Sequence, residues 1–308
     1  METNILITYK QLSNRPSFNL AWEEYILKNL YDGQAIFLLW TNEPSVIVGR
    51  NQNVYQEVDL KYLSQKNIPI LRRNSGGGTV YHDLGNINYT FITESKGKIS
   101  KYDLMTKPII NALNQMGINA YFRPNSDVYI DDKKIGGNAQ YLHKNILLHH
   151  GTILFNTNLN MLNNSLKQPN HISSISVKSR LSNVVNVSNF INLTIEEFIS
   201  NLYEIITPNL VTKQLTDTDL FKIYLLEKEK YLTDEWNYFE SPKSTFKIEQ
   251  DNFVIEINIV KGYIDKCIIK YQGVNLTEIE QTLLNKPFTV KDLSFLKDIN
   301  LNLFNLLF

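Results

Sequence analysis

The segment Arg72-Arg73-Asn74-Ser75-Gly76-Gly77-Gly78-Thr79-Val80-Tyr81-His82 places three consecutive glycines directly after two arginines. It follows the apolar run 68–71, which predicts a strand, and glycine triplets weaken strands and helices. We therefore expect a loop here that either turns tightly or lets a ligand approach the backbone. Because guanidinium groups suit phosphate and carboxylate, that ligand is expected to be an anion. The alternative is a glycine-rich hairpin turn with solvated arginines.

Short runs of β-branched and aromatic residues, bounded by turn residues, predict strands on both sides of this loop. They lie at 36–40, 46–48, 68–71, 87–92, 118–122, 127–131, 134–142 and 146–155, with Asp131-Asp132-Lys133 as one of the turns.

Apolar residues at helical spacing predict four helices in the same part of the chain. The first covers 17–31, with Ser17 as its N-cap and Gly33 after its end. The others cover 103–116, where Pro108 opens or kinks the helix and Gly117 ends it, 195–206, which begins with a capping box of Thr194 and Glu197, and 220–232.

The pattern breaks around 236–242 and then restarts, which predicts a domain boundary near residue 243. Two alternating strands at 253–260 and 267–271 precede two helices, and the last helix ends in the leucine-rich stretch 303–308. Those leucines are expected to complete a small core rather than to contact a membrane. The sequence therefore predicts an α+β protein. A large mixed-sheet domain flanked by helices covers 1–243, and a small C-terminal α/β accessory domain covers 244–308.

The composition limits the kinds of partner. Among 308 residues, 31 are Lys or Arg and 31 are Asp or Glu, so no net positive field favours a nucleic acid or an anionic membrane. The first residues lack a signal-peptide pattern and no run of 18 apolar residues occurs, so a cytoplasmic location is expected. A single cysteine, Cys267, excludes an internal disulfide and a cysteine-based zinc site.

Three other polar motifs accompany the glycine loop. Asn125-Ser126-Asp127 enters a strand and is followed seven residues later by Lys134, which is next to two glycines and small residues. Such a lysine can lie along a phosphate chain, although a surface hairpin lysine is the alternative.

The adjacent pair His149-His150 lies on a strand, where neighbouring side chains face opposite sides. We therefore expect one buried, hydrogen-bonded histidine at the site rather than a metal shared by both. The polar loop 176–183 is either a further anion contact or a surface turn.

Better-known phosphate loops and catalytic signatures are absent from the sequence. It contains no GxxxxGK[ST] and no strand-linked GxGxxG, which argues against a P-loop NTPase and a Rossmann enzyme. It also contains no HExxH, GxSxG or kinase signature.

Taken together, these motifs resemble the lipoate-protein ligase A family of the lipoyl and biotinyl protein ligases. The resemblance is collinear over nearly the whole chain. It rests on Phe18-Asn19-Leu20-Ala21-Trp22-Glu23-Glu24, on Gly49-Arg50-Asn51-Gln52-Asn53, and on 72–86, 134–140, 149–152 and Ser179-Arg180. It implies a catalytic domain at 1–243 that uses ATP and Mg²⁺ to make lipoyl-AMP from free lipoate, a salvage reaction. The lipoyl group would then pass to a lysine of an acceptor, either the E2 subunit of a 2-oxoacid dehydrogenase or the glycine cleavage H protein. Octanoate is a possible second substrate.

The resemblance also implies site residues. Lys134 is the expected catalytic residue, with Asp127 orienting it or, as the less favoured role, accepting a proton. The residues implied for ATP are Arg73, Gly78, Thr79, Val80, Tyr81 and Lys134. Those implied for lipoate are Arg73, Gly76, Gly77, His82, Lys134, Gly137, Ala139 and His150. Possible further contacts are Arg50, Asn86, Asn138, Gly151 and Arg180. Magnesium is expected to be held through the ATP phosphates.

Two departures from the family pattern stand out. Gly136 occupies a position where many relatives have serine, which would remove a hydroxyl near the adenylate, and Phe239 interrupts the usual WNYGxSP linker.

Three rival functions remain open at this point. An ATP-independent octanoyl or lipoyl acyltransferase of the same superfamily often needs a catalytic cysteine near the active loops, whereas Cys267 lies in the C-terminal part. A biotin ligase has a different glycine motif, and the regulatory kind has a DNA-binding domain before the catalytic pattern, which here starts by Phe18. A non-catalytic adenylate-binding protein would not need Arg73, the three glycines and Lys134 together.

Overall fold

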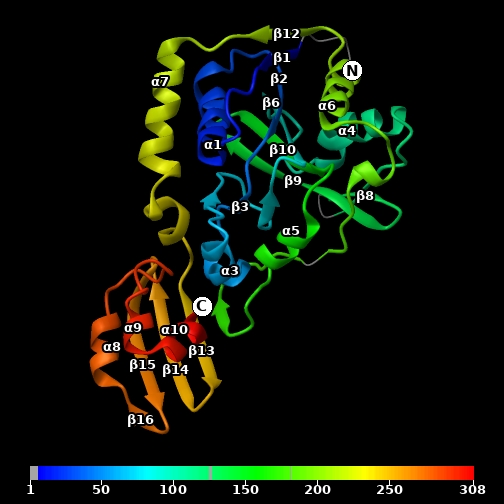
Figure 1. Cartoon of the computed structure of the whole chain (residues 1–308). Coiled ribbons are helices and arrows are strands. Elements are labelled where there is room, and N and C mark those ends of the chain that lie inside the picture. The colour runs from blue at the N-terminus through cyan, green and yellow to red at the C-terminus, as the bar shows by residue number, and fades with distance from the viewer. Residues whose placement is uncertain (1–5, 125–126, 181) are drawn as a thin grey trace.

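The computed structural model describes residues 6–124, 127–180 and 182–308. A large upper body contains the N-terminal part of the chain, and a smaller module made by the C-terminal part lies below it (Figure 1). Asn125 and Ser126 of the predicted strand entry lie outside the described residues, as does Leu181 of the polar loop.

An eight-stranded sheet forms the centre of the upper body. In spatial order its strands are β12 (Leu210–Lys213), β1 (Leu6–Tyr9), β2 (Ile36–Thr41), β6 (Asn86–Glu94), β10 (Ile146–Leu154), β9 (Lys133–His143), β8 (Asp127–Ile130) and β7 (Tyr121–Arg123). Strand β1 runs parallel to both of its neighbours, and the other pairs are antiparallel. The predicted large mixed sheet is therefore confirmed.

Helices cover both faces of this sheet because its central strands are apolar on both sides. On one face, Phe37 and Leu39 of β2 pack with α4 (Tyr102–Gln115) and α6 (Ile195–Ile206). On the other face, Leu38 and Trp40 pack with four helical segments. These are α1 (Pro16–Tyr25), its π-helical continuation η1 (Ile26–Leu30), and α7 (Asp217–Leu226) with its π-helical continuation η3 (Glu227–Tyr231). Each large apolar side chain buried in this way stabilises the fold by about 1.5–3 kcal/mol.

A three-stranded sheet, β4-β3-β5, carries the glycine loop. It consists of β3 (Ser45–Val48), β4 (Ile70–Arg72) and β5 (Val80–His82), so the loop 73–79 joins two strands that flank β3. Short helices α2 (Val54–Glu57), α3 (Leu60–Gln65) and α5 (Leu159–Ser165) lie beside it. The glycine loop thus starts and ends on paired backbone, which fixes its two ends.

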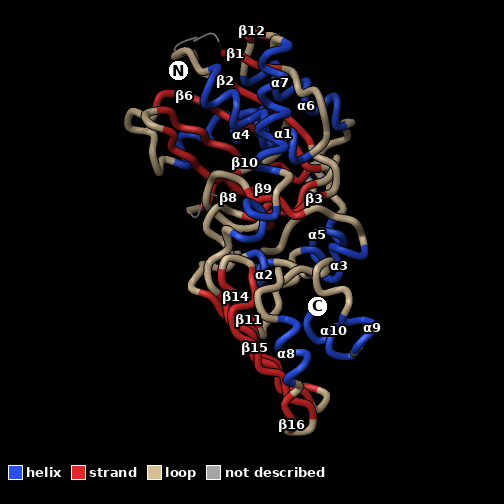
Figure 2. The backbone as a smooth tube through the Cα atoms, turned by 90° about the vertical axis from the view of Figure 1, so that its left-hand side faces the viewer, coloured by secondary structure: helices blue, strands red, loops and turns tan. Residues whose placement is uncertain are grey.

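The C-terminal module is a five-stranded antiparallel sheet with helices on one face, as Figure 2 shows edge-on. Its strands are β11 (Ile172–Ser174), β13 (Ser244–Gln250), β14 (Phe253–Val260), β15 (Tyr263–Tyr271) and β16 (Val274–Asn275), and its helices are α8 (Thr277–Leu283), α9 (Leu296–Ile299) and α10 (Leu301–Leu307). The C-terminal leucines Leu303 and Leu307 are buried in its core. Strand β11 comes from the N-terminal side of the predicted boundary at residue 243 and pairs with β13.

One expectation about local structure needs correction. Ser17 does not cap α1, because the helix begins at Pro16 and the Ser17 hydroxyl donates 2.6 Å to Glu227 instead. Where the sequence pattern breaks around 236–242, Glu235–Phe239 forms a π-helical turn, η4. A 3₁₀ turn, η2, covers Val187–Asn189. The capping box of Thr194 and Glu197, the end of α4 before Gly117 and the turn at Asp131 and Asp132 are confirmed. Among the helices that the structure describes, none is long and apolar enough to cross a membrane.

Candidate active site

A cavity of about 580 Å³ opens between the glycine loop and strands β9 and β10. Its lining contains most of the residues that the resemblance implies. They are Arg73, Gly76, Gly77, Gly78, Thr79, Val80, His82, Asp127, Lys134, Gly137, Asn138, Ala139, His150, Gly151 and Arg180. Sequence segments separated by about a hundred positions therefore meet at one concave surface, as a binding site requires.

Arg73 holds the glycine loop from inside. Its guanidinium donates to the carbonyl groups of Gly76 at 2.6 Å and Gly78 at 2.7 Å, to Ile47 at 3.0 Å, and to the Ser75 hydroxyl at 3.0 Å. Burial lowers the pKa of Arg73 to about 10, so the group is still charged at neutral pH. Arg73 therefore shapes the glycine loop and adds a positive charge beneath it, while most of its N–H groups are used within the protein.

Glycine is required in this loop for both conformation and space. Gly77 has a φ of +86°, a region that side chains disfavour, and a Cβ there would lie 3.0 Å from Nη2 of Arg73 and 3.6 Å from the Cβ of Ala139. At Gly78, a Cβ would lie 3.1 Å from the hydroxyl oxygen of Ser179. The loop therefore lies close to β9 on one side and to the loop around Ser179 on the other.

Lys134 lies in the wall opposite the glycine loop. Its ammonium is 2.8 Å from Oδ1 of Asp127, and both side chains are partly exposed, at 24% and 20%. The backbone of Lys134 is held on its other side, because its N–H donates to Asn183 and its carbonyl accepts from Val185. A Cβ on Gly137 would lie 3.4 Å from the Lys134 ammonium, so this glycine leaves the space through which the lysine can move.

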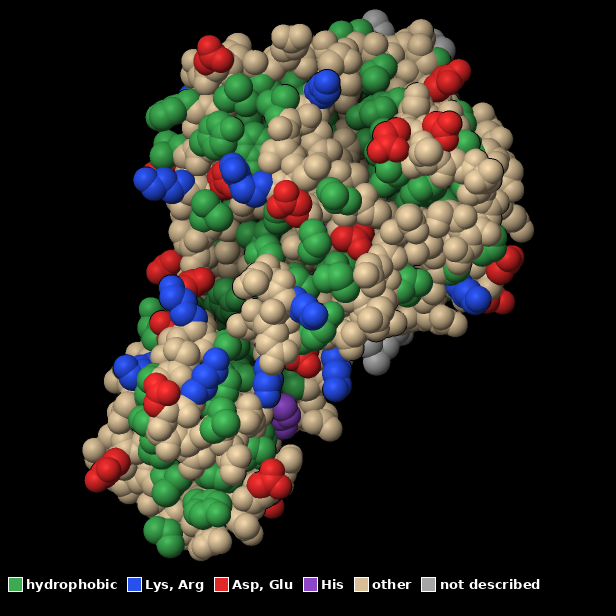
Figure 3. Space-filling model, in the orientation of Figure 1, with side chains coloured by type: hydrophobic (Ala, Val, Ile, Leu, Met, Phe, Trp, Pro, Cys, Tyr) green, Lys and Arg blue, Asp and Glu red, His purple; other side chains and the backbone are tan. Residues whose placement is uncertain are grey.

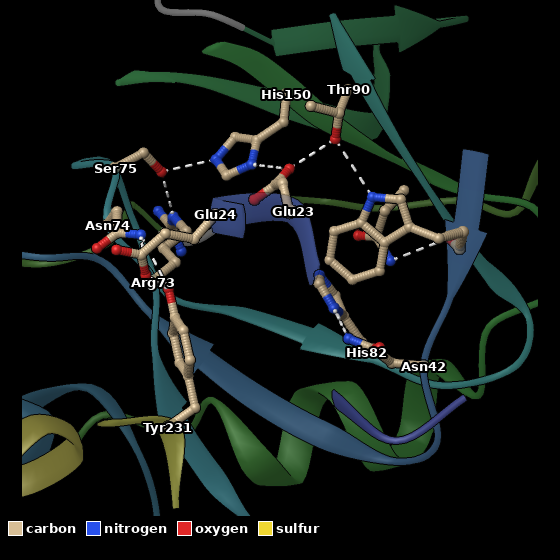
Figure 4. A network of polar contacts seen from close by, with 12 residues as sticks. Glu23, Glu24, Asn42, Arg73, Asn74, Ser75, His82, Thr90, His150 and Tyr231 are labelled. Atoms are coloured by element: carbon tan, nitrogen blue, oxygen red, sulfur yellow. Dashed lines mark hydrogen bonds and ion pairs between the residues drawn. The ribbon is translucent and has the colours of Figure 1, made fainter. Parts of the chain in front are cut away.

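His150 belongs to a chain of hydrogen bonds at the back of the cavity (Figure 4). The Glu23 carboxylate can only accept, so Nδ1 of His150 donates to it at 3.0 Å. Nε2 of His150 lies 2.6 Å from the Ser75 hydroxyl, which in turn accepts from Arg73. The Thr90 hydroxyl also donates to Glu23, at 2.6 Å. This chain couples the orientation of His150 to the glycine loop.

The two adjacent histidines face opposite sides of β10, as the alternation of a strand predicts. His150 lines the cavity, whereas His149 is fully buried against Thr106 and Gln140. Burial lowers the pKa of His149 to about 3. The pKa of His82, which accepts a hydrogen bond from Asn42 in the cavity wall, is also lowered to about 3 by burial and by the charge of Arg73. His82 and His149 are therefore neutral at physiological pH.

Three implied residues lie outside this cavity. Tyr81 packs into the neighbouring core and borders a smaller cavity of about 140 Å³ behind the loop. Arg50 stacks over Trp236 and pairs with Glu240 at 2.9 Å. Asn86 is buried at the start of β6, where it donates to Asn88. The structure thus gives these three side chains contacts within the protein.

Several cavity residues were not assigned roles from the sequence. Gln52 accepts from the Thr79 hydroxyl at 2.8 Å and donates to Ser179 at 3.0 Å, so it connects the glycine loop with the polar loop. Ser179 in turn donates to the buried Glu57 and accepts from the Thr79 N–H at 2.7 Å. Leu20 and Trp40 form part of the apolar wall. Gln52 and Leu20 lie inside motifs that carry the resemblance, which was the available signal, whereas nothing in the local sequence pointed to Glu57.

Gly136 has no space for a side chain in this backbone. A Cβ at this position would lie 1.9 Å from the carbonyl oxygen of Thr152 on the adjacent strand. A serine here would require β9 and β10 to move apart. The missing hydroxyl therefore goes together with two strands that lie too close to each other at this point for any side chain.

No group of three or more His, Cys, Asp or Glu side chains able to hold a metal occurs within residues 6–124, 127–180 and 182–308.

Comparisons with known proteins agree with the geometry. Residues 15–207 match the family model of the lipoyl protein ligase A/B catalytic domain. The chain is 36% identical to the lipoate-protein ligase LplJ of Bacillus subtilis over 300 residues, which cover 92% of this chain and 91% of the relative. It is 39% identical to lipoate-protein ligase 1 of Staphylococcus aureus over 282 residues, covering 87% and 86%.

Two solved structures are similar to about three quarters of the chain. One is from an archaeal lipoylation system, a bipartite lipoate protein ligase and its E2 lipoyl domain from Thermoplasma acidophilum. It has 28% identity, a TM-score of 0.67, and coverage of 77% of this chain and 97% of that chain. The other is a lipoate-protein ligase A bound with ATP, with 28% identity, a TM-score of 0.66, and coverage of 76% and 98%.

Proposed function

The chain belongs to the lipoyl protein ligase A/B family and is an ATP-dependent lipoate-protein ligase, and we propose how its own residues perform the two half-reactions. In the first, lipoate and ATP form lipoyl-AMP and pyrophosphate. In the second, the lipoyl group passes to a lysine of an acceptor protein, and AMP leaves. The expected assignment of the large domain, 1–243, as catalytic and of 244–308 as accessory is part of this proposal.

One observation carries the proposal: a lysine paired with an aspartate lies across a cavity from a glycine loop that rests on a buried arginine. Joining a carboxylate to the α-phosphate of ATP brings two anions together. Fixed positive charge and backbone N–H groups are what such a reaction needs. The glycine loop leaves backbone N–H groups accessible, and Lys134 supplies a compact charge that can serve both anions.

In the proposed adenylation step, a lipoate carboxylate oxygen attacks the α-phosphorus and the bond to the pyrophosphate leaving group breaks. Lys134 exchanges its contact with Asp127 for contacts with the two reacting anions, while Asp127 limits the positions that the ammonium can take. Residues 76–79 cradle the phosphates, and Ala139 and His150 contact the lipoate chain. Magnesium would arrive on the ATP phosphates, where it would neutralise part of their charge.

In the proposed transfer step, a neutral acceptor lysine attacks the carbonyl carbon of lipoyl-AMP. An amide bond forms, the bond to AMP breaks, and the amine releases a proton. No covalent bond to the enzyme is needed, because the mixed anhydride is already activated. The apolar wall of Leu20 and Trp40 would keep water from the anhydride until the acceptor arrives.

The acceptor and the location of the protein are also proposals. The archaeal neighbour was studied with its E2 lipoyl domain, which supports E2 subunits as acceptors of this chain. The glycine cleavage H protein is a second acceptor that shares the same chemistry, and octanoate is a possible second acyl substrate. We also propose that the reaction takes place in the cytoplasm.

The deciding experiment measures pyrophosphate release by the full chain with ATP, Mg²⁺ and lipoate, octanoate or biotin. Lipoate should support release and biotin should not. Adding an E2 lipoyl domain or the H protein should give a lipoylated lysine detectable by mass spectrometry. Acyl transfer without ATP would instead support an acyltransferase, and adenylate binding without turnover would support a regulatory protein.

A further inference from the structure

The loop that follows β11 has the reverse of the usual distribution of polar and apolar side chains. Ile175 and Val177 are 91% and 84% exposed, the two highest values among the large hydrophobic residues that the structure describes as exposed. The serines beside them point the other way and are bonded to the protein. Exposed single apolar residues are common, but a segment whose serines are partly buried and hydrogen-bonded while its β-branched residues are exposed needs a reason.

The serine contacts show that the segment is held in this orientation. Ser174 donates to the carbonyl of Lys243 at 2.8 Å, and Ser176 donates to the side chain of Gln56 at 2.8 Å. Ser179 is bonded to Glu57 and accepts from the N–H of Thr79 in the glycine loop. Ile175 and Val177 alternate with these anchors, so their outward direction is fixed by the contacts of their neighbours.

The position of this segment relates it to the reaction. Residues 177–180 line the mouth of the cavity, and β11 lies at the junction of the upper body and the C-terminal module (Figure 1). A macromolecule that delivers a lysine to the cavity must pass this mouth. The segment 175–180, called here the outer strip, is therefore part of the surface that such a partner meets.

The charge around the outer strip indicates the kind of partner. Lys178, Arg180 and Lys243 are exposed, and within the part of the chain that the structure describes none of the three forms an ion pair. Figure 3 shows Lys and Arg side chains on this face near the junction, with Asp and Glu side chains among them. The protein as a whole is neutral, and the three exposed cations favour an acidic partner at this position.

We propose that the outer strip is the docking site for the acceptor domain, with Ile175 and Val177 contacting an apolar patch beside the target lysine and the cations contacting acidic residues around it. This inference rests on the proposed function and adds the surface that selects the acceptor. The centre of a protein interface is apolar and its rim is polar, which is the arrangement of the strip.

The test separates docking from chemistry. Ile175→Asp places a carboxylate at the most exposed apolar position, which does not line the cavity, and Val274→Asp is the matched control at the far end of the module, where Val274 is 66% exposed. Three rates are measured on the full chain: pyrophosphate release with lipoate, transfer from the adenylate to hydroxylamine, and transfer to a lipoyl acceptor domain. Hydroxylamine is a small nucleophile that needs no docking surface.

For Ile175→Asp we expect a KM for the acceptor domain about tenfold higher or more, with pyrophosphate release and hydroxylamine transfer within twofold of the wild-type rates. Ile175→Leu should restore the KM, and Val274→Asp should leave all three rates unchanged. Raising the salt concentration should increase the wild-type KM for the acceptor.

An unchanged acceptor KM in Ile175→Asp overturns the proposal. A loss of pyrophosphate release in that variant also overturns it, and makes the strip part of the adenylate enclosure. If wild-type protein makes no adenylate from lipoate, the proposed function itself fails, which is a different result. A concentration-dependent dimer that Ile175→Asp abolishes, with the acceptor KM unaffected, would assign the strip to self-association.

Discussion

The upper body and the C-terminal module differ in what they contribute to the cavity. Every cavity-lining residue that the structure describes comes from residues 20–180, and the strands and helices formed after residue 243 contribute none of them. The module nevertheless packs closely against the body. The rings of Tyr55 in the body and Phe288 in the module pack edge to face, with their centroids 5.5 Å apart, in one shared apolar core. The difference supports the proposal that binding and chemistry belong to the body and that the module affects them through the parts that it touches.

Two consecutive arginines make this comparison concrete. Arg73 turns toward the glycine loop, whereas Arg72 turns toward the linker and is also fully buried. Arg72 donates to the carbonyl groups of Gly49 and Gln52 in the body, and to the carbonyl of Asn237 and the hydroxyl of Ser241 in the linker. Burial lowers its pKa to about 10, so it remains charged. The conformation of the glycine loop therefore depends on Arg73, and the position of the linker, residues 236–242, depends on the adjacent Arg72.

The largest effect is expected in the body, for Lys134→Ala. Removing the ammonium should lower the rate of pyrophosphate release by about 10²–10³-fold, the range seen when a transition-state contact is lost. The protein should fold, because the Lys134 side chain is partly exposed and makes one ion pair. Lys133→Ala is the matched control, since Lys133 is an exposed neighbour on the same strand. A near wild-type rate in Lys134→Ala would contradict the assignment of this lysine.

Arg72→Met tests whether body and module are energetically joined. The substitution leaves several buried carbonyl groups without their donor, and we expect the free energy of unfolding to fall by about 3 kcal/mol. Arg50→Met is the control, because Arg50 is partly exposed and its ion pair with Glu240 should contribute less than about 1 kcal/mol. Urea unfolding followed by tryptophan fluorescence measures both. Equal, small losses would mean that the linker is held by other contacts.

Gly77→Val is expected to lower both the stability of the body and its affinity for ligands, through a single position of the glycine loop. The positive φ of Gly77 strains any β-branched residue, so unfolding should become easier by about 2 kcal/mol. The new side chain should also enter the space of the ligand and weaken the binding of ATP and lipoate. Gly76→Val is the stability control, since a Cβ at Gly76 meets no atom within 4 Å. Calorimetry that finds unchanged ligand affinities for Gly77→Val would make the loop a structural turn.

The sequence predicted the parts of the molecule whose pattern is local. The glycine loop, the apolar strands and Lys134 close to two glycines could be recognised because each carries its own signal over a few residues. Strands such as β11 and β12 were missed, because three or four residues of ordinary polarity become a strand only when a distant partner pairs with them.

Side-chain directions were the least predictable feature. The sequence predicts Arg73 as an anion ligand. In the structure its N–H groups mostly donate to the glycine loop and to the carbonyl of Ile47 in β3, a strand that the local sequence could not place beside it. The sequence predicts Ser17 as a helix cap, but its hydroxyl donates to Glu227, which lies 210 positions away in the sequence. In both cases the deciding partner is brought close only by the tertiary fold.

A pH-dependent loss of stability is expected to arise in the body. His82 and His149 have folded pKa values of about 3 because burial disfavours their charged forms, whereas an unfolded histidine has a pKa of about 6.5. Below pH 6.5 the unfolded state binds more protons, so stability is complete above that pH and is lost as the pH falls toward 3. From pH 7.5 to 5.5 the loss should be about 1.4 kcal/mol per histidine. Urea unfolding of His149→Gln should show a loss about 1.4 kcal/mol smaller than that of the wild type over this range, and an unchanged dependence would assign the sensitivity elsewhere.

The smallest effect is expected in the module, for Cys267→Ser, although this residue decides between two reaction classes. Cys267 lies in β15 opposite Ile257, and burial, with a smaller contribution from Glu280, raises the pKa of its thiol to about 12. A protonated thiol in a sheet that contributes nothing to the cavity is a poor nucleophile, and lipoyl-AMP does not need one. We therefore expect ATP-dependent lipoylation of an acceptor domain to stay within about twofold, with a stability loss of about 1 kcal/mol for placing a hydroxyl in a partly apolar site. Loss of transfer in a folded Cys267→Ser protein, or a thioester adduct on Cys267 in the wild type, would give the module a chemical role and replace the ligase mechanism with a transferase.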